Sequence, residues 1–277
     1  MTSNHAAFTG SIPEIYDAHL GPYLFEFSAR DLAERVKDRI TPESRILEVA
    51  CGTGISTYHL RKALPSNIHI TATDLNPAML DFAKNRHEDL PGVTFEVADA
   101  LSLSFNNHDF DAVICQFGIM FFPDKYKGLA EMTRTLKPGG ILAFNVWDSL
   151  EKNKSAAIAH TIISSFFEND PPQFLTTPFG FHDTDHIKNL LVQTGLENIA
   201  FQAVSEIIDV HDAAHLARGY VEGNPGVIEI NERGTVEAGA ITLAIADMLE
   251  KTFGPPPLGI EFHEIIFTAT KPLKNET

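Results

Sequence analysis

The feature that most constrains the fold is an alternation, between residues 45 and 147, of short apolar runs with segments of helical pattern. The runs are RILEVA, HITATD, VTFEVAD, FDAVICQF and GILAFNVW. Apolar strands that alternate with helices predict a parallel sheet covered on both faces, so we expect a doubly wound α/β core. The helix boundaries agree, because Asn76 and Pro77 suit the start of one helix, and Asp124 suits the start of another that ends at Lys137.

The chain beyond this region is expected to complete the sheet and to cover its binding edge. Strands are predicted at 197–210 and 259–270, and helices at 153–168 and 184–195. A segment that follows a parallel strand leaves from its carboxyl end, where open α/β sheets bind ligands. The expected organisation is a leader with cap helices at 1–40, a ligand-binding core at 41–150, cap insertions that form the acceptor site at 151–183 and 211–252, and the remainder of the core sheet at 184–210 and 253–277.

Composition excludes several classes of function. The 277 residues are 44% hydrophobic, enough for a sizeable core, and a formal charge of -16 disfavours nucleic acid and anionic membrane surfaces. Cys51 and Cys115 alone cannot build a disulfide framework or a structural zinc site, and the 12 histidines form no HExxH pattern, so we expect no metal. No membrane span or signal peptide is indicated. A reducing cytoplasm fits best, and a homodimer stays open, although no heptad or exposed apolar stripe argues for one.

The first strand carries an acid, Glu48, and runs into two glycines, Gly52 and Gly54. Glycines at this point let the backbone approach a ligand closely. The dinucleotide fingerprint would place a third glycine at Thr57 and no acid within the strand. A carboxylate repels a pyrophosphate and suits an ammonium group. These residues therefore favour S-adenosylmethionine, which has a sulfonium and an amino group and no phosphate, over NAD.

The ends of the next two strands offer groups that suit a nucleoside. Asp74 ends the second strand, where a carboxylate accepts hydrogen bonds from both ribose hydroxyls. Asp99 offers an acceptor to an exocyclic amine, and Ala100 is a small neighbour over which a purine can lie. Leu75 and Met79 would supply the apolar faces of that slot.

Five stretches together, LEVACGTG, Asp74, VADA, FDAVICQFGIMFFPD and LKPGGILAFNVWD, resemble class I S-adenosylmethionine-dependent methyltransferases, specifically the small-molecule and quinone-type branch. The leader resembles that branch as well, so the resemblance covers residues 8–148. It implies a seven-stranded Rossmann-like sheet whose last strand is antiparallel, with helical cap insertions. It also implies S-adenosylmethionine as the cofactor, over the carboxyl edge of the sheet, and S-adenosylhomocysteine as the product.

The resemblance also implies roles for individual residues. It places Glu48 near the methionine end, the two glycines along the methionine moiety, and Gln116 and Phe117 beside the sulfonium. Ala50 stands where the family often has its first glycine, which should narrow the loop slightly. The predicted cofactor-binding residues are Tyr16, Glu48, Ala50, Cys51, Gly52, Gly54, Asp74, Leu75, Met79, Asp99, Ala100, Gln116 and Phe117.

Each of these side chains also has a purely structural interpretation. Glu48 would pair with a buried cation, Arg45 or Lys62, and Asp74 would only favour a helix N-terminus. Asp99 would form a turn, and both cysteines would be small buried hydrophobes. The cluster Phe117, Phe121 and Phe122 would be plain core.

Methyl transfer from a sulfonium needs chiefly a well-placed acceptor and the exclusion of water. A base is optional, and a neutral histidine is the usual choice. His182, His211 and His215 are candidates by their position in the cap insertions, but no catalytic residue is assigned. The phenylalanines of the first insertion favour an apolar or aromatic acceptor; they are Phe166, Phe167, Phe174, Phe179 and Phe181.

The sequence thus predicts a methyltransferase that acts on a small, hydrophobic or aromatic metabolite. Two alternatives stay open at this point. One is a regulatory protein that binds S-adenosylmethionine without catalysis, and the other is an NAD-dependent oxidoreductase. A cavity between Phe117 and the cap would distinguish an enzyme from a regulator, because a regulator can fill that space with side chains.

Overall fold

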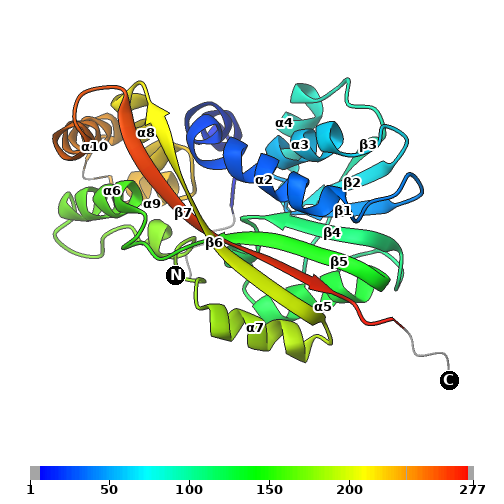
Figure 1. The fold of residues 1–277 in the computed structure, drawn as a ribbon. Coiled ribbons are helices and arrows are strands. Elements are labelled where there is room, and N and C mark those ends of the chain that lie inside the picture. The colour runs from blue at the N-terminus through cyan, green and yellow to red at the C-terminus, as the bar shows by residue number, and fades with distance from the viewer. Residues whose placement is uncertain (1–6, 235, 274–277) are drawn as a thin grey trace.

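The structure, a computed structural model, describes residues 7–234 and 236–273. Its centre is a seven-stranded sheet in the order β3-β2-β1-β4-β5-β7-β6 (Figure 1). The strands are β1 Arg45–Val49, β2 His69–Asp74, β3 Val93–Val97, β4 Phe110–Gln116, β5 Leu136–Trp147, β6 Glu197–Val210 and β7 Leu258–Thr270. Strands β1 to β5 pair in parallel, and β7 is antiparallel to both β5 and β6. This confirms the predicted α/β sheet and its antiparallel last strand.

Helices cover both faces of the sheet (Figure 1). On one face lie α2 Glu26–Lys37, α3 Ile55–Ala63 and α4 Pro77–Arg86, and on the other lie α5 Lys125–Thr135 and α7 Thr184–Gln193. The apolar stripe of α2 packs on the middle of the sheet, where Leu32, Val36, Ile46 and Ile114 are buried together. The sheet is thus covered as its continuous apolar strands require.

Side-chain caps mark the starts of α5 and α7. Asp124 accepts a hydrogen bond from the Lys127 N–H, and Asp183 caps α7. Two predictions at helix boundaries were wrong. The Asn76 side chain does not cap α4, because its amide binds Asp74 instead. Helix α5 ends at Thr135 and not at Lys137, because β5 already begins at Leu136 and pairs there with β4.

A second group of helices lies beyond the core sheet, beside the far ends of β6 and β7 (Figure 1). It consists of α6 Lys154–Ser165, α8 Ala213–Glu222, α9 Gly226–Arg233 and α10 Ala238–Phe253. The short turns η2 Ile119–Phe121 and η3 Phe174–Thr176 lie in the connecting segments. Residues 1–6 of the predicted leader and 274–277 of the predicted last segment lie outside the described residues.

The N-terminal segment reaches this group through an uncommon element. After α1 Ile12–Ile15, residues Tyr16–Phe25 form η1, a π-helix of ten residues with Pro22 inside it. Helix η1 packs on α8 and on α2. π-Helices are rare, occur mostly as single turns within α-helices, and are frequent at functional sites.

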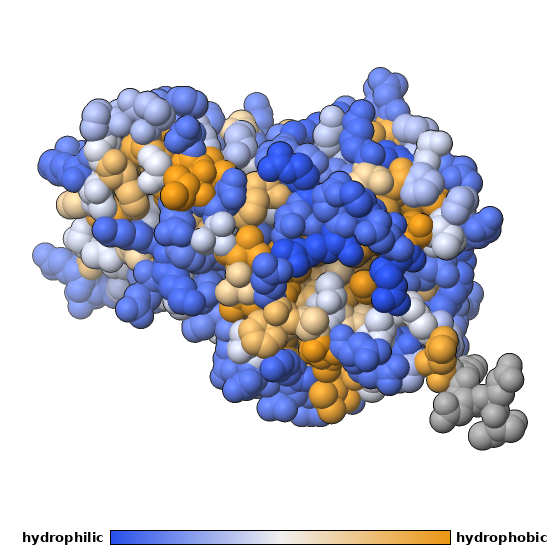
Figure 2. All heavy atoms as spheres, in the orientation of Figure 1, coloured by the Kyte–Doolittle hydropathy of each residue, from blue (hydrophilic) through white to orange (hydrophobic). Residues whose placement is uncertain are grey.

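The face shown in Figure 2 is mostly hydrophilic, with hydrophobic side chains gathered over the long strands β6 and β7. Phe201 and Ile207 are the large exposed hydrophobic side chains of β6, which ends the sheet. No helix within the described residues is long and apolar enough to cross a membrane.

Candidate functional site

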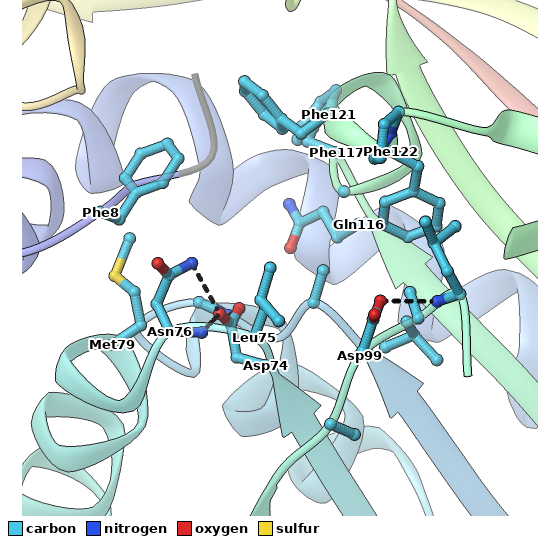
Figure 3. Close-up of a pocket in the computed structure, with 18 of the residues that line it drawn as sticks. Phe8, Asp74, Leu75, Asn76, Met79, Asp99, Gln116, Phe117, Phe121 and Phe122 are labelled. Atoms are coloured by element: carbon cyan, nitrogen blue, oxygen red, sulfur yellow. Dashed lines mark hydrogen bonds between the residues drawn. The ribbon is translucent and has the colours of Figure 1, made fainter. Parts of the chain in front are cut away.

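The carboxyl ends of β1, β2 and β4 surround a cavity of about 790 Å³, including the part open to solvent. Most of the predicted cofactor-binding residues line it: Tyr16, Ala50, Gly52, Asp74, Leu75, Met79, Asp99, Ala100, Gln116 and Phe117. Figure 3 shows Asp74, Leu75 and Met79 on one side, and Phe117 and Phe121 on the other. We call this space the cofactor cavity. Cys51 lines a smaller adjoining cavity, and its pKa is raised chiefly by burial, as expected for a buried thiol.

Asp74 is the buried acid of the cofactor cavity. Its Oδ2 accepts the Gly52 N–H at 2.9 Å, and its Oδ1 accepts the Asn76 N–H at 2.8 Å. Burial raises the pKa of Asp74, and these hydrogen bonds oppose that rise. The acid therefore holds the two loops together as well as facing the cavity.

The loop after β1 has a left-handed backbone at three positions. Ala50 has φ 58°, Gly52 has φ 57° and Gly54 has φ 83°. Ala50 thus adopts a conformation that favours glycine, at the position where the family often has one. A Cβ built on Gly52 meets nothing within 4 Å, so the backbone of Gly52 faces open space.

Gly54 and Glu48 line neither the cofactor cavity nor the smaller cavity at Cys51. A Cβ on Gly54 would come within 2.7 Å of the His87 ring, so close packing on α4 requires glycine here. The Glu48 carboxylate accepts hydrogen bonds from the hydroxyls of Ser56 and Thr57, the latter at 2.6 Å. Their contacts with the cofactor stay predictions.

The hydrogen bond from the Thr57 hydroxyl therefore explains how an apolar strand accommodates an acid. Glu48 is fully buried, and burial raises its pKa to about 7 against the hydrogen bonds from Ser56 and Thr57. Neither cation proposed for the structural alternative binds it. Arg45 pairs with Asp109, and Lys62 lies over the Tyr58 ring.

Asp99 lines the cofactor cavity and also forms a turn. Its Oδ1 accepts the Leu101 N–H at 2.8 Å (Figure 3). The side chain is exposed, so its second oxygen remains available. Leu75, beside it in the cavity, is 53% exposed although it is apolar. An apolar side chain left open to a cavity is what a planar ligand would cover.

A second cavity of about 510 Å³, including its open part, lies between the cofactor cavity and the cap. The two share Phe8, Tyr16, Phe117 and Phe121. We call it the apolar cavity; its remaining lining residues are Leu20, Leu24, Phe25, Met120, Trp147, Phe174, Leu175, Pro178, Phe179, Tyr220 and Asn224. Two of the five phenylalanines predicted to contact the acceptor are among them, whereas Phe166, Phe167 and Phe181 are not.

Tyr16 stands at the junction of the two cavities. Its ring stacks on Phe25 at 4.6 Å between centroids, and Phe8 meets it edge-on. Burial raises the pKa of the Tyr16 hydroxyl far above its ordinary value, and the charge of Asp74 adds to the rise. The hydroxyl therefore stays protonated and is a hydrogen-bond donor.

None of the three candidate histidines lines the cofactor or the apolar cavity. His182 lies within hydrogen-bond distance of the Phe179 carbonyl, 2.8 Å from its Nδ1. His211 is exposed at the end of β6. His215 packs on the ring of His19 at 3.9 Å. Within the described ranges no group of three His, Cys, Asp or Glu could hold a metal ion.

Sequence reasoning missed several lining residues. Phe8 and Asn76 line the cofactor cavity, and Trp147, Tyr220 and Asn224 line the apolar cavity. The Tyr220 hydroxyl lies 2.9 Å from the Ser155 hydroxyl. Of these residues, Trp147 could have been predicted from the sequence, because it ends the strand that runs beside β4 at the binding edge. The others come from loops and helices whose positions no local pattern fixes.

Comparisons with known proteins agree with this geometry. Residues 46–140 match a family model described as a methyltransferase domain. A ubiquinone/menaquinone biosynthesis C-methyltransferase of Burkholderia vietnamiensis is 32% identical over 176 residues, which cover 60% of this chain and 72% of that protein. A demethylmenaquinone methyltransferase of Deinococcus radiodurans is 42% identical over 99 residues, and the match spans only 41% of it. The crystal structure of the YcgJ protein of Bacillus subtilis superposes with a TM-score of 0.57 at 16% identity, covering 89% of this chain and 99% of that chain.

Proposed function

The chain belongs to the class I S-adenosylmethionine-dependent methyltransferases, and from that premise we propose that it methylates a small, hydrophobic metabolite with a planar ring. The observation that carries the proposal is the wall shared by the two cavities. Tyr16 and Phe117 border both. A ligand in one cavity therefore lies next to a ligand in the other.

The residues of the cofactor cavity fit S-adenosylmethionine. Asp74 offers carboxylate oxygens to the ribose, and Leu75 and Met79 offer apolar surface to the adenine. The bare backbone of Gly52 leaves room for the methionine part. Bound there, the cofactor would supply a methyl group activated by a positively charged sulfur.

The chain's own residues then have two tasks, which are to orient the acceptor and to exclude water. The apolar cavity is walled by aromatic and aliphatic side chains. The side chains with a polar group among its described lining are Tyr16, Trp147, Tyr220 and Asn224. Apolar walls bind an apolar ring and leave few ordered waters to compete. Tyr16, held protonated, would orient an oxygen of the acceptor as a donor and not remove its proton.

The apolar cavity also bears on the regulatory alternative. A protein that only binds the cofactor has no need of space between Phe117 and the cap. Phe117 instead faces a cavity whose far side is formed by Phe174 and Phe179. This space supports an enzyme. The names of the curated relatives refer to ubiquinone and menaquinone, and quinols are therefore the first acceptors to test.

The test is transfer of radiolabelled methyl from S-adenosylmethionine to 1,4-naphthoquinol, to catechol and to the polar acceptor ethanolamine. We expect label on one of the two ring compounds and none on ethanolamine. Leu175→Asp should abolish transfer but keep cofactor binding, because a buried charge in the apolar cavity excludes the ring. The matched control is Leu243→Asp, at a side chain 69% exposed. Label on ethanolamine alone would refute the apolar acceptor.

A cytoplasmic location and a homodimer stay predictions. Sedimentation of the purified protein tests the second.

A further inference from the structure

Phe117 has a backbone conformation that its side chain does not favour. Its φ is 49°, in the left-handed region, directly after β4. Its ring stacks on Trp147 at 4.0 Å between centroids with an interplanar angle of 9°. Non-glycine residues in this region persist only where their surroundings hold them, and they cluster at functional sites. Something must hold Phe117.

The group that holds it is a buried amide. The Phe117 N–H donates to Oδ1 of Asn145, on β5, at 3.0 Å. Asn145 Nδ2 in turn donates to Oε2 of Glu264, on β7, at 2.5 Å. Both side chains are 0% exposed, and neither lines the cofactor or the apolar cavity.

The direction of each hydrogen bond follows from the one before it. An N–H needs an acceptor, so the Asn145 amide must present its oxygen to Phe117. The amide nitrogen then points the other way and needs an acceptor of its own. The Glu264 carboxylate provides one. Without it the amide, which is fully buried, loses the partner that fixes its orientation.

We propose that Glu264 and Asn145 are positioning residues, which act through the Phe117 backbone to fix the Phe117 side chain where the cofactor cavity meets the apolar cavity. The inference rests on the proposed function, because the position of Phe117 matters for catalysis only if methyl transfer takes place beside it. Glu264 never touches a ligand in this account. Burial raises the pKa of Glu264 to about 7, and the charges of Asp31 and Arg35, on α2, act on it in opposite directions.

A double-mutant cycle tests whether the two residues act as one unit. Titration calorimetry with S-adenosylmethionine is the readout, for Asn145→Ala, Glu264→Ala and the double variant. We expect each single variant to weaken binding by about 5- to 20-fold, and the double variant to be no worse than Asn145→Ala within about twofold, because residues in one hydrogen-bond network are not additive. Glu264→Gln should rescue, since its side-chain oxygen still accepts from Asn145.

Trp147 gives a second readout that needs no cofactor. It is the only tryptophan of the chain, and it stacks on Phe117. Release of Phe117 should shift the emission of Trp147 and raise its quenching by acrylamide in Asn145→Ala and Glu264→Ala, but not in Glu264→Gln. Thr135→Val is the matched control, because it removes a buried hydrogen bond, to the Met132 carbonyl, far from both cavities.

The outcomes separate the two proposals. If Glu264→Ala lowers only the melting temperature, as Thr135→Val does, and leaves cofactor affinity and Trp147 emission unchanged, the positioning role is refuted. Additive effects in the double variant would also refute it. If the wild type fails to bind S-adenosylmethionine while the emission changes still follow the expected pattern, the proposed function fails and the hold on Phe117 stands. Where the alanine variants do not fold, Asn145→Ser, which is smaller and polar, takes their place with the same expectations.

Discussion

At the scale of single residues, the cofactor cavity depends on backbone shape as much as on side chains. Gly52 shows this most directly, because its φ is 57° and a Cβ there would project into open space. Gly52→Val should therefore abolish binding of S-adenosylmethionine in calorimetry while the protein remains folded. The left-handed φ adds a cost of about 1 to 2 kcal/mol to the free energy of folding. Normal cofactor affinity in this variant would mean that the loop does not border the methionine part.

At Ala50 we expect a substitution to have the opposite effect on the free energy of folding. It has a left-handed φ of 58°, so Ala50→Gly relieves strain of about 1 to 2 kcal/mol and loses about 0.5 to 1 kcal/mol to chain entropy. We expect the free energy of unfolding in urea to stay unchanged or to rise. Ala33→Gly, at a buried position inside α2, is the control and should lower it by about 1 kcal/mol. A loss at Ala50 as large as that at Ala33 would contradict the strain.

At the scale of elements, the π-helix η1 forms one wall of the site and is held by charges. Arg86, the last residue of α4, pairs with Asp17 of η1 and lies 3.8 Å from Glu26 of α2. His59 of α3 approaches the same Glu26 at 2.5 Å. Because Tyr16 of η1 lines both cavities, the position of this helix affects the shape of both.

Loss of the ion pair between Arg86 and Asp17 should leave η1 less firmly held beside the two cavities. We expect Arg86→Met to weaken S-adenosylmethionine binding by about 1 to 2 kcal/mol, mostly through faster dissociation, since the Asp17 side chain is only 13% exposed and is left unpaired. Stopped-flow measurement of dissociation tests this. Arg218→Met breaks a surface pair with Glu222 and should change nothing. Equal effects in both variants would exclude a specific role for Arg86.

The elements also show what a sequence can reveal. Strand β6 spans Glu197–Val210, the predicted bounds, because its run of apolar residues and the preceding Gly195 are local signals. Helix η1 was not predicted, because a π-helix has no distinct residue pattern and depends on its contact with α8. The pair Asn145 and Glu264 was missed for the same kind of reason. Their positions are 119 residues apart, and only the antiparallel pairing of β5 with β7 brings them together.

At the scale of the whole molecule, the two buried acids make stability depend on pH. Glu48 and Glu264 each have a pKa of about 7 in the folded protein, raised by burial from the ordinary value of 4.5. The folded state thus binds protons more tightly than the unfolded chain. Their contribution to stability is complete below about pH 4.5 and is lost as pH rises through 7.

Urea unfolding between pH 5 and pH 8 measures this loss. Relative to Glu264→Gln, the wild type should lose about 2 to 3 kcal/mol of unfolding free energy over that range. A parallel comparison with Glu48→Gln should give a loss of the same sign. If the difference between wild type and variant stays constant with pH, or grows in favour of the wild type, the acids are not held protonated by burial.

That the predicted residues line a cavity at the carboxyl edge followed from the sequence, because strand ends and glycines are local signals. Of the apolar cavity, Phe174 and Phe179 were predicted, and most of its other walls were not. Its walls come from η1, the segment around η3 and α8, which meet only in the folded chain.

The central claim is that the cavity at the carboxyl edge binds S-adenosylmethionine. Titration calorimetry of the wild type with S-adenosylmethionine, S-adenosylhomocysteine and NADH tests it most directly. Micromolar binding of the first two and none of the third is the predicted result, and binding of NADH alone would contradict the account.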